Sequence, residues 1–210
     1  QPSAEATATA EPTPEPTATP EPTPEAALVN PLTGETTTKD YSKTRPVAIM
    51  VENDHWDAPL LPISQGSISK AAIVYEAQVE QITRNMFVFM DLDDVQNINP
   101  IRSCRSYFVS MALSYDAIFA HCGESADGAE FSAPMLANFV DNDNINVNEQ
   151  NGTGFRLSEY PYSGGVHSMT TTGELLQNFI AENNTRTEHK TDSYDYGLRF
   201  TENAAPTNGS

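Results

Sequence analysis

The chain has 210 residues and a formal net charge of −18, because 29 acidic residues stand against only 11 Lys and Arg. This balance argues against nucleic acid or anionic lipid headgroups as the main partner, since both are bound through clustered basic side chains. The sequence contains no apolar run of 18 residues, so no transmembrane helix is predicted. Any contact with a membrane is therefore expected to come from an anchor outside this sequence.

The first 27 residues, QPSAEATATAEPTPEPTATPEPTPEAA, consist mainly of Pro, Thr, Glu and Ala. Such a segment cannot bury enough apolar surface to offset its ordering entropy, so we predict an extended spacer rich in polyproline II. A spacer of this kind is typical of an exported domain tethered to a membrane or wall, and a lipid-modified cysteine upstream of Gln1 is our hypothesis. We expect one domain over 28–200, and a linker or the truncated start of a C-terminal domain over 201–210.

The first half of the foldable chain predicts strands. A nearly continuous apolar run over 45–53 predicts a buried strand. After a loop and a short helix near 64–70, residues 71–80 and 84–94 predict two strands joined as an antiparallel hairpin.

The second half predicts helices alternating with strands. Apolar residues at helical spacing predict a helix over 103–115 with Ser103 as its N-cap, and 116–123 repeats the pattern of a buried strand. A further helix around Pro134, a short strand within 141–155 and a capped amphipathic helix over 170–184 follow. Together these elements predict an α/β fold, with a mixed parallel and antiparallel sheet and helices packed on its faces.

Arg102 and Arg105 stand three residues apart at the expected start of the second helix. Backbone N–H groups and the helix macrodipole already favour anions there, and each guanidinium adds a planar fork of donors that matches carboxylate or phosphate. The pattern predicts an anion site that includes Ser103. The alternative is structural: the arginines pair with internal carboxylates such as Glu76 or Glu80.

Two histidines lie at junctions between elements, where the ligands of such sheets usually bind. His121 ends a predicted strand, and His167 follows a Gly-Gly turn. With Glu76, Glu80 and Arg84 they would form one polar cluster if the loops converge, although either histidine alone is more often structural. No zinc-ligand spacing occurs, and the acidic loops are more simply solvated than calcium-binding. No metal and no cofactor are predicted.

Cys104 and Cys122 are the only cysteines, and each sits beside a predicted site residue. Cys122 cannot pair with His121 as a catalytic thiolate and imidazole, because adjacent strand residues point to opposite faces, but pairing with His167 across loops stays open. The two cysteines are either bridged, as an oxidising compartment would allow, or free buried thiols.

The motifs NPLTG, RPVAIMVEN, IVYEAQVEQITR, PIRSCRSYF, YDAIFAHCGES and GGVHSMTTTGELL together resemble the DUF3048 family of YerB-like lipoproteins of Gram-positive bacteria. The resemblance covers residues 30–182. It implies an exported, lipid-anchored, two-domain protein on the extracellular face of the cytoplasmic membrane, of which this chain is mainly the first domain. It carries over the motif residues Glu76, Glu80, Arg84, Arg102, Ser103, Arg105, His121 and His167.

The resemblance also shows departures. Family members usually have small residues where Cys104 and Cys122 stand, and this paired replacement favours a local disulfide. The expected function is a binding domain whose Arg/His/Glu pocket takes an anionic or peptide-like envelope component, with its own C-terminal domain as a further partner. The alternatives are a wall-directed hydrolase or transferase, with His121 or His167 as general base, and a protein–protein module that regulates a wall enzyme.

Overall fold

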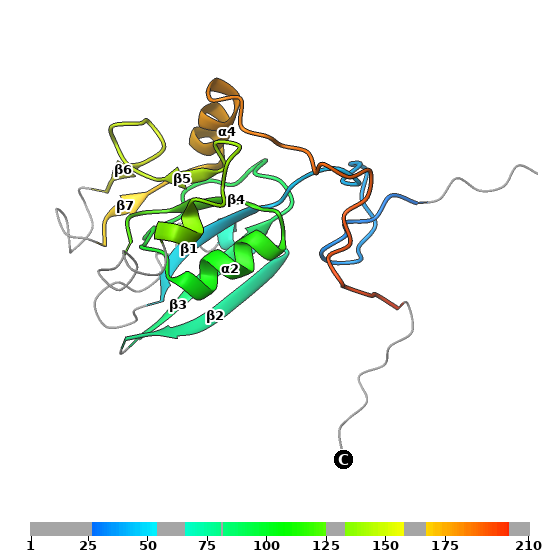
Figure 1. The fold of residues 1–210 in the computed structure, drawn as a ribbon, viewed down its shortest axis with the longest axis horizontal. Helices are drawn as coiled ribbons and strands as arrows, with labels where there is room; N and C mark the ends of the chain where they lie inside the picture. Colours follow the sequence, from blue (N-terminus) through cyan, green and yellow to red (C-terminus); the bar gives the residue numbers. More distant parts are fainter. Residues whose placement is uncertain (1–26, 54–65, 81, 125–132, 158–166, 202–210) are drawn as a thin grey trace, which may run out of the picture.

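The computed structural model describes residues 27–53, 66–80, 82–124, 133–157 and 167–201 (Figure 1). The strands and helices follow the chain in this order: β1 (Val47–Asn53), β2 (Ile73–Val79), β3 (Ile82–Phe89), α2 (Ser106–Ser114), β4 (Ile118–His121), β5 (Asn144–Asn146), β6 (Phe155–Arg156), β7 (Met169–Thr170) and α4 (Gly173–Glu182). The predicted spacer over 1–27, except its last residue, and the 201–210 segment, except its first, lie outside the described residues.

Five strands form the main sheet in the order β2-β3-β1-β4-β5. β2 and β3 form the predicted antiparallel hairpin, and β3 also pairs antiparallel with β1. β4 is parallel to both β1 and β5. The prediction of a mixed α/β sheet is therefore confirmed.

Helices cover both faces of this sheet. Successive residues of a strand point to opposite faces, so each strand supplies side chains to two separate cores. Ala48 and Met50 of β1 join one core, which contains the buried side chains of α2. Val47, Ile49 and Val51 join the other core, together with Leu176 of α4 and Met169 of β7. In Figure 1, α2 lies in front of the sheet, and α4 lies at the top of the view near β4 and β5.

The amino ends of the three parallel strands are joined by a buried arginine. Arg45, just before β1, donates through Nη2 to Asp143 Oδ2 at 2.6 Å and through Nε to the carbonyl of Asp116 at 2.6 Å. Nη1 donates to the carbonyl of Arg186, also at 2.6 Å. This arginine ties the residues before β4 and β5 to the segment that follows α4, at the opposite end of the sheet from the predicted site.

Two elements differ from the expectation. The helix predicted from Ser103 begins at Ser106, because residues 101–104 are hydrogen-bonded into the sheet instead. A second, two-stranded sheet of β6 and β7 was not predicted, since strands of two residues carry no readable pattern. α4 begins as predicted at a capped position: the Thr172 hydroxyl accepts from the backbone N–H of Leu175 at 3.1 Å.

Candidate functional site

The candidate site forms where β1 and β4 separate at their carboxyl ends. Their parallel pairing ends at Ile49 and Ala120, and the segment Ile101–Cys104 then lies between them. Arg102 donates its backbone N–H to Met50 O at 3.1 Å and accepts from Cys122 N at 3.0 Å. β1 connects to one side of the sheet and β4 to the other, so this gap is the topological switch point at which ligands of such sheets bind.

Glu52 is a fully buried carboxylate at the end of β1. Its Oε2 lies 2.5 Å from Nδ1 of His167, and its Oε1 lies 2.9 Å from Nε of Arg102. The contact with Arg102 is an ion pair. Glu52 thereby joins two of the predicted site residues that come from distant segments.

Arg84 lies directly opposite Glu52 on β3 and is only 2 % exposed. Its Nη1 donates to the carbonyl of Ser103 at 2.6 Å. The pKa of the Arg84 guanidinium is lowered to about 10, first by burial and then by the positive charges of Arg105 and Arg102, against the opposing effect of Glu52 and Glu80. The lowered pKa reflects crowding of positive charge in a poorly solvated place.

Arg105 connects the start of α2 to the hairpin turn. Its Nε and Nη2 hold both carboxylate oxygens of Glu80 at distances between 2.8 and 3.0 Å, and its Nη1 donates to Cys104 O at 2.9 Å. Glu80 sits at the turn between β2 and β3 with φ of 46°. This is the internal pairing that the structural alternative anticipated for one arginine.

The N-terminus of α2 departs from the prediction at Ser103. The N-cap is Arg105, whose side chain makes no capping hydrogen bond, and the first turn contains no acidic residue. Ser103 is therefore not the cap, and it contributes its backbone carbonyl to Arg84 instead. The positive end of α2 thus begins beside the arginine cluster and adds to its charge.

Two of the predicted residues lie apart from this cluster. Glu76 points to the other face of the sheet, where its Oε1 accepts from Asn53 Nδ2 at 3.0 Å and Thr83 Oγ1 at 2.7 Å. His121 is buried on the β5 side, with Nδ1 2.8 Å from Gly123 O and Nε2 2.8 Å from Asn144 Oδ1. Burial lowers the pKa of His121, which favours the neutral ring.

The structure thus brings together six of the eight predicted residues and adds one. The six are Glu80, Arg84, Arg102, Ser103, Arg105 and His167. The residue that the sequence reading missed is Glu52, and its signal was an acidic residue inside the otherwise apolar strand VAIMVEN. A lone charge in a buried strand indicates a partner or a function.

The structure has both cysteines as free thiols, not joined in the disulfide that the paired replacement favoured. Cys104 packs into the core beneath α2, whereas Cys122 packs against the core on the α4 face. Their side chains therefore point to opposite sides of the sheet. Burial raises the pKa of Cys104 to about 11 and also raises the pKa of Cys122, although Arg156 and Arg102 counteract the second shift.

Two further properties bear on function. Among the described residues, no group of three or more His, Cys, Asp and Glu side chains is arranged to hold a metal ion. Within the same part of the chain, no helix is both long and apolar enough to cross a bilayer. A cavity of about 850 Å³, which none of the residues of this cluster line, lies between residues 29–35 and 194–201.

The fold and the site define a mixed α/β domain with a charged cluster at its switch point. The profile of the DUF3048 family, described as the N-terminal domain of a protein of unknown function, matches residues 32–186. The chain therefore belongs to the DUF3048 family, as its motifs indicated.

Two relatives extend this assignment. A curated Bacillus subtilis (strain 168) protein, named "Putative lipoprotein YerB", is 41 % identical over 96 residues, which are 45 % of this chain and 27 % of that protein. The crystal structure of YerB from Bacillus subtilis matches with a TM-score of 0.59 and 27 % identity, over 79 % of this chain and 53 % of that one. The chain thus spans about half of the solved relative and less of the curated one.

Proposed function

We propose that this chain is a binding domain of a lipid-anchored cell-envelope protein, and that its arginine cluster holds an anionic or peptide-like group. The observation that carries the proposal is the local excess of positive charge. Three guanidiniums, those of Arg84, Arg102 and Arg105, gather around residues 103–105, while two carboxylates, Glu52 and Glu80, face them. This excess occurs in a chain whose net charge is −18.

The geometry leaves part of the cluster accessible to a ligand. The side chain of Arg102 is 19 % exposed, as is that of His167, whereas Glu52 between them is fully buried. Glu80 is about half exposed, so a ligand carboxylate could compete with it for the fork of Arg105. A planar, bidentate ligand group suits such arginines better than it would suit lysines.

The membrane attachment is part of the same proposal. The relative named as a lipoprotein supports a lipid anchor upstream of this chain, which would place the domain on the extracellular face of the cytoplasmic membrane. The Pro- and Thr-rich sequence over 1–27 suits a spacer between such an anchor and the domain. The family description of an N-terminal domain supports a C-terminal domain as a further partner.

A second candidate function is that of a hydrolase or transferase acting on envelope material. The observation that favours it is the hydrogen bond between buried Glu52 and Nδ1 of His167, because a carboxylate that orients an imidazole is a common arrangement for a general base. His167 is the better candidate base than His121, whose two ring nitrogens both face protein oxygens. If this function holds, hydrolysis of p-nitrophenyl acetate will slow in His167→Gln and not in His121→Gln.

The binding proposal is tested with inorganic phosphate and with acetate, each against chloride at equal ionic strength. At about 10 mM, a ligand with a dissociation constant near 1 mM should raise the melting temperature by about 4 °C. Arg102→Lys keeps the charge but loses the fork, so it should abolish the shift. Arg199→Lys, at an exposed arginine paired with Asp195, is the matched control. Equal shifts in all three proteins, or none in any, would refute the proposal.

A further inference from the structure

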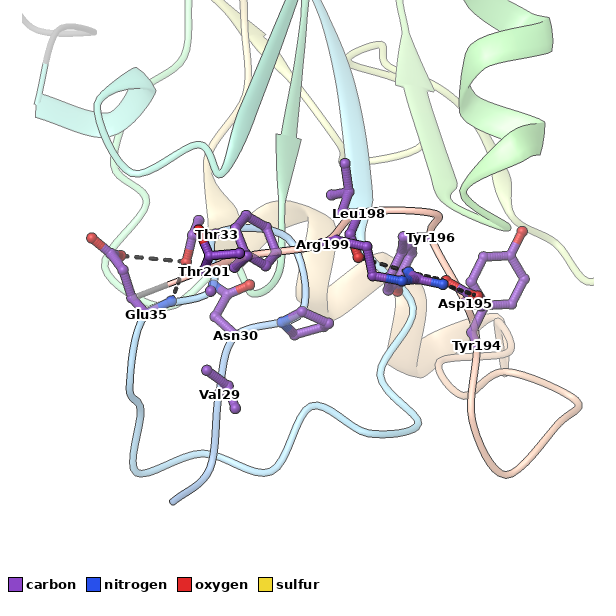
Figure 2. Close-up of a pocket in the computed structure, with 13 residues that line it drawn as sticks. Val29, Asn30, Thr33, Glu35, Tyr194, Asp195, Tyr196, Leu198, Arg199 and Thr201 are labelled. Carbon is purple, nitrogen blue, oxygen red and sulfur yellow. Dashed lines mark hydrogen bonds and ion pairs between the residues drawn. The ribbon is translucent and has the colours of Figure 1, made fainter. Parts of the chain in front are cut away.

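The segments at the two ends of the described chain line an open cavity of about 850 Å³, a volume within the range of ligand sites (Figure 2). One wall comes from residues 29–35 and the other from residues 194–201. The cavity is remote from the arginine cluster. The cluster gathers at the carboxyl ends of β1 and β4, whereas Tyr196 of the cavity wall donates to the carbonyl of Thr44 at 3.3 Å, just before the amino end of β1. It is therefore a separate site.

Aromatic rings line this cavity with their carbon surfaces. One face of Tyr194 is stacked on His189, with ring centroids 4.2 Å apart and planes 11° apart, and its hydroxyl donates to Ser114 O at 2.8 Å. The hydroxyl of Tyr196 is 2.8 Å from His189 Nε2. Because both hydroxyls are engaged within the protein, the two tyrosines offer ring surface rather than polar groups to a ligand.

Phe200 adds a third ring, which the fold holds in place although it is half exposed. The ring lies so close to Gly34 that a Cβ there would come within 2.4 Å of Phe200 Cγ, and Gly34 has φ of 76°. Glycine is the residue that accepts both that conformation and that approach. The phenyl ring is thus seated on the opposite wall rather than left free in solvent.

The polar part of the cavity is a planar ion pair. Arg199 Nη1 and Nη2 donate to the two carboxylate oxygens of Asp195 at 2.9 and 2.8 Å, and the backbone N–H of Gly197 donates to the same carboxylate at 2.8 Å. Figure 2 shows Arg199 reaching along the cavity toward Asp195, with Glu35 on the other segment. The pair offers donors and acceptors side by side, and Glu35 leaves the rim slightly acidic.

From this arrangement we infer that the cavity is a second binding site, for a neutral oligosaccharide built of N-acetylhexosamine units. A sugar ring has an apolar C–H face that packs on aromatic surface, and hydroxyls that suit the paired donors and acceptors of Asp195 and Arg199. The acetamido group adds a methyl for the aliphatic wall at Val29 and Leu198, and an N–H for a carboxylate. The acidic rim and the charge of −18 disfavour a polyanionic glycan.

The test is a titration of the ¹⁵N-labelled chain with tri-N-acetylchitotriose, followed by amide chemical shifts. The expected result is a saturable change confined to 29–35 and 194–201. Phe200→Ala should weaken binding roughly fivefold, the scale of one lost aromatic contact. Val140→Ala, which truncates another exposed apolar side chain away from this cavity, should change nothing.

The wild-type shift map decides the matter even if a variant folds poorly. Changes elsewhere in the chain, or no change up to about 10 mM trisaccharide, would overturn the inference. N-acetyltyrosinamide serves as the second probe: if it binds this cavity and the trisaccharide does not, the cavity seats a peptide side chain and the saccharide inference is wrong. Anion binding by the arginine cluster is measured independently, so the two proposals fail separately.

Discussion

The carboxylate of Glu52 lies 2.5 Å from Nδ1 of His167, although the two residues are 115 positions apart in the sequence. The same carboxylate lies 2.9 Å from Arg102. One buried acid on β1 therefore holds together the loop before α2 and the loop before β7.

Glu52→Gln should destabilise the protein by about 3 kcal/mol, because it removes the buried charge that neutralises Arg102. Glu76→Gln is the matched control: Glu76 is exposed on the other face of the sheet, and an amide oxygen can still accept from Asn53 and Thr83. Its expected loss is below about 1 kcal/mol. Urea unfolding monitored by circular dichroism measures the free energy of unfolding of both variants. Equal losses would mean that the buried ion pair of Glu52 stabilises the protein no more than the exposed contacts of Glu76 do.

The free energy of unfolding should fall as the pH is lowered from about 7 to about 5. Burial lowers the pKa of both His121 and His189 in the folded state, so between the folded and unfolded pKa values the unfolded chain binds more protons. This contribution is complete above the unfolded value of about 6.5 and is lost below it, by at most about 1.4 kcal/mol per pH unit for each histidine. His121→Gln should remove the contribution of this histidine to the dependence of the free energy of unfolding on pH. If the free energy of unfolding depends on pH equally in this variant and in the wild type, the pKa of His121 is not lowered by burial.

Intact mass after purification without reductant should show two free thiols. Alkylation of the native protein at about pH 8 should be slow at both positions, because burial raises both thiol pKa values, and slower at fully buried Cys104 than at half-buried Cys122. Unfolding in urea should make both thiols reactive. A native mass lower by two hydrogens, restored by reductant, would show that the cysteines are bridged after all.

Gly173→Ala should destabilise the protein by about 2 kcal/mol, although alanine is the better helix former. Gly173 is the first residue of α4, and a Cβ there would lie 2.2 Å from the backbone carbonyl oxygen of Leu92. A backbone atom cannot move aside as a flexible side chain can. Thermal unfolding compares this variant with Glu174→Ala in the same helical turn, where the expected change is below about 0.5 kcal/mol. Stabilisation by Gly173→Ala would show that α4 does not pack this closely.

The main sheet could be predicted because its strands are long enough to show a pattern. The apolar run before Asn53 and the hairpin of β2 and β3 are visible in the sequence, and the observed bounds differ from the expected ones by a few residues. β6 and β7 could not be found in this way. Strands of two residues are defined by their partner across the sheet, which a single sequence does not reveal.

The sequence was sufficient to predict which residue types form the site, but not which side chains contact one another. The structural alternative to an anion site paired the arginines with Glu76 or Glu80. Glu80, at the turn of the hairpin, does pair with Arg105, whereas Glu76 points to the other face of the sheet. The sequence reading missed Glu52 because a single carboxylate in an apolar strand resembles a strand end. It also proposed Ser103 as a helix cap, since helical spacing does not show that residues 101–104 pair with the sheet.

Residues 43–45, before β1, and residues 187–189, after α4, lie against each other as a short antiparallel pair. Arg45 donates its backbone N–H to Thr187 O at 2.9 Å, and His189 donates to Lys43 O at 2.7 Å. If the chain is pulled from its N-terminal and C-terminal sides, the hydrogen bonds of this pair are loaded one after another. They would break before the force reached the hydrogen bonds between β1 and β4. The pair therefore acts as a weak link in series with the sheet, which would give way first and protect the site from tension.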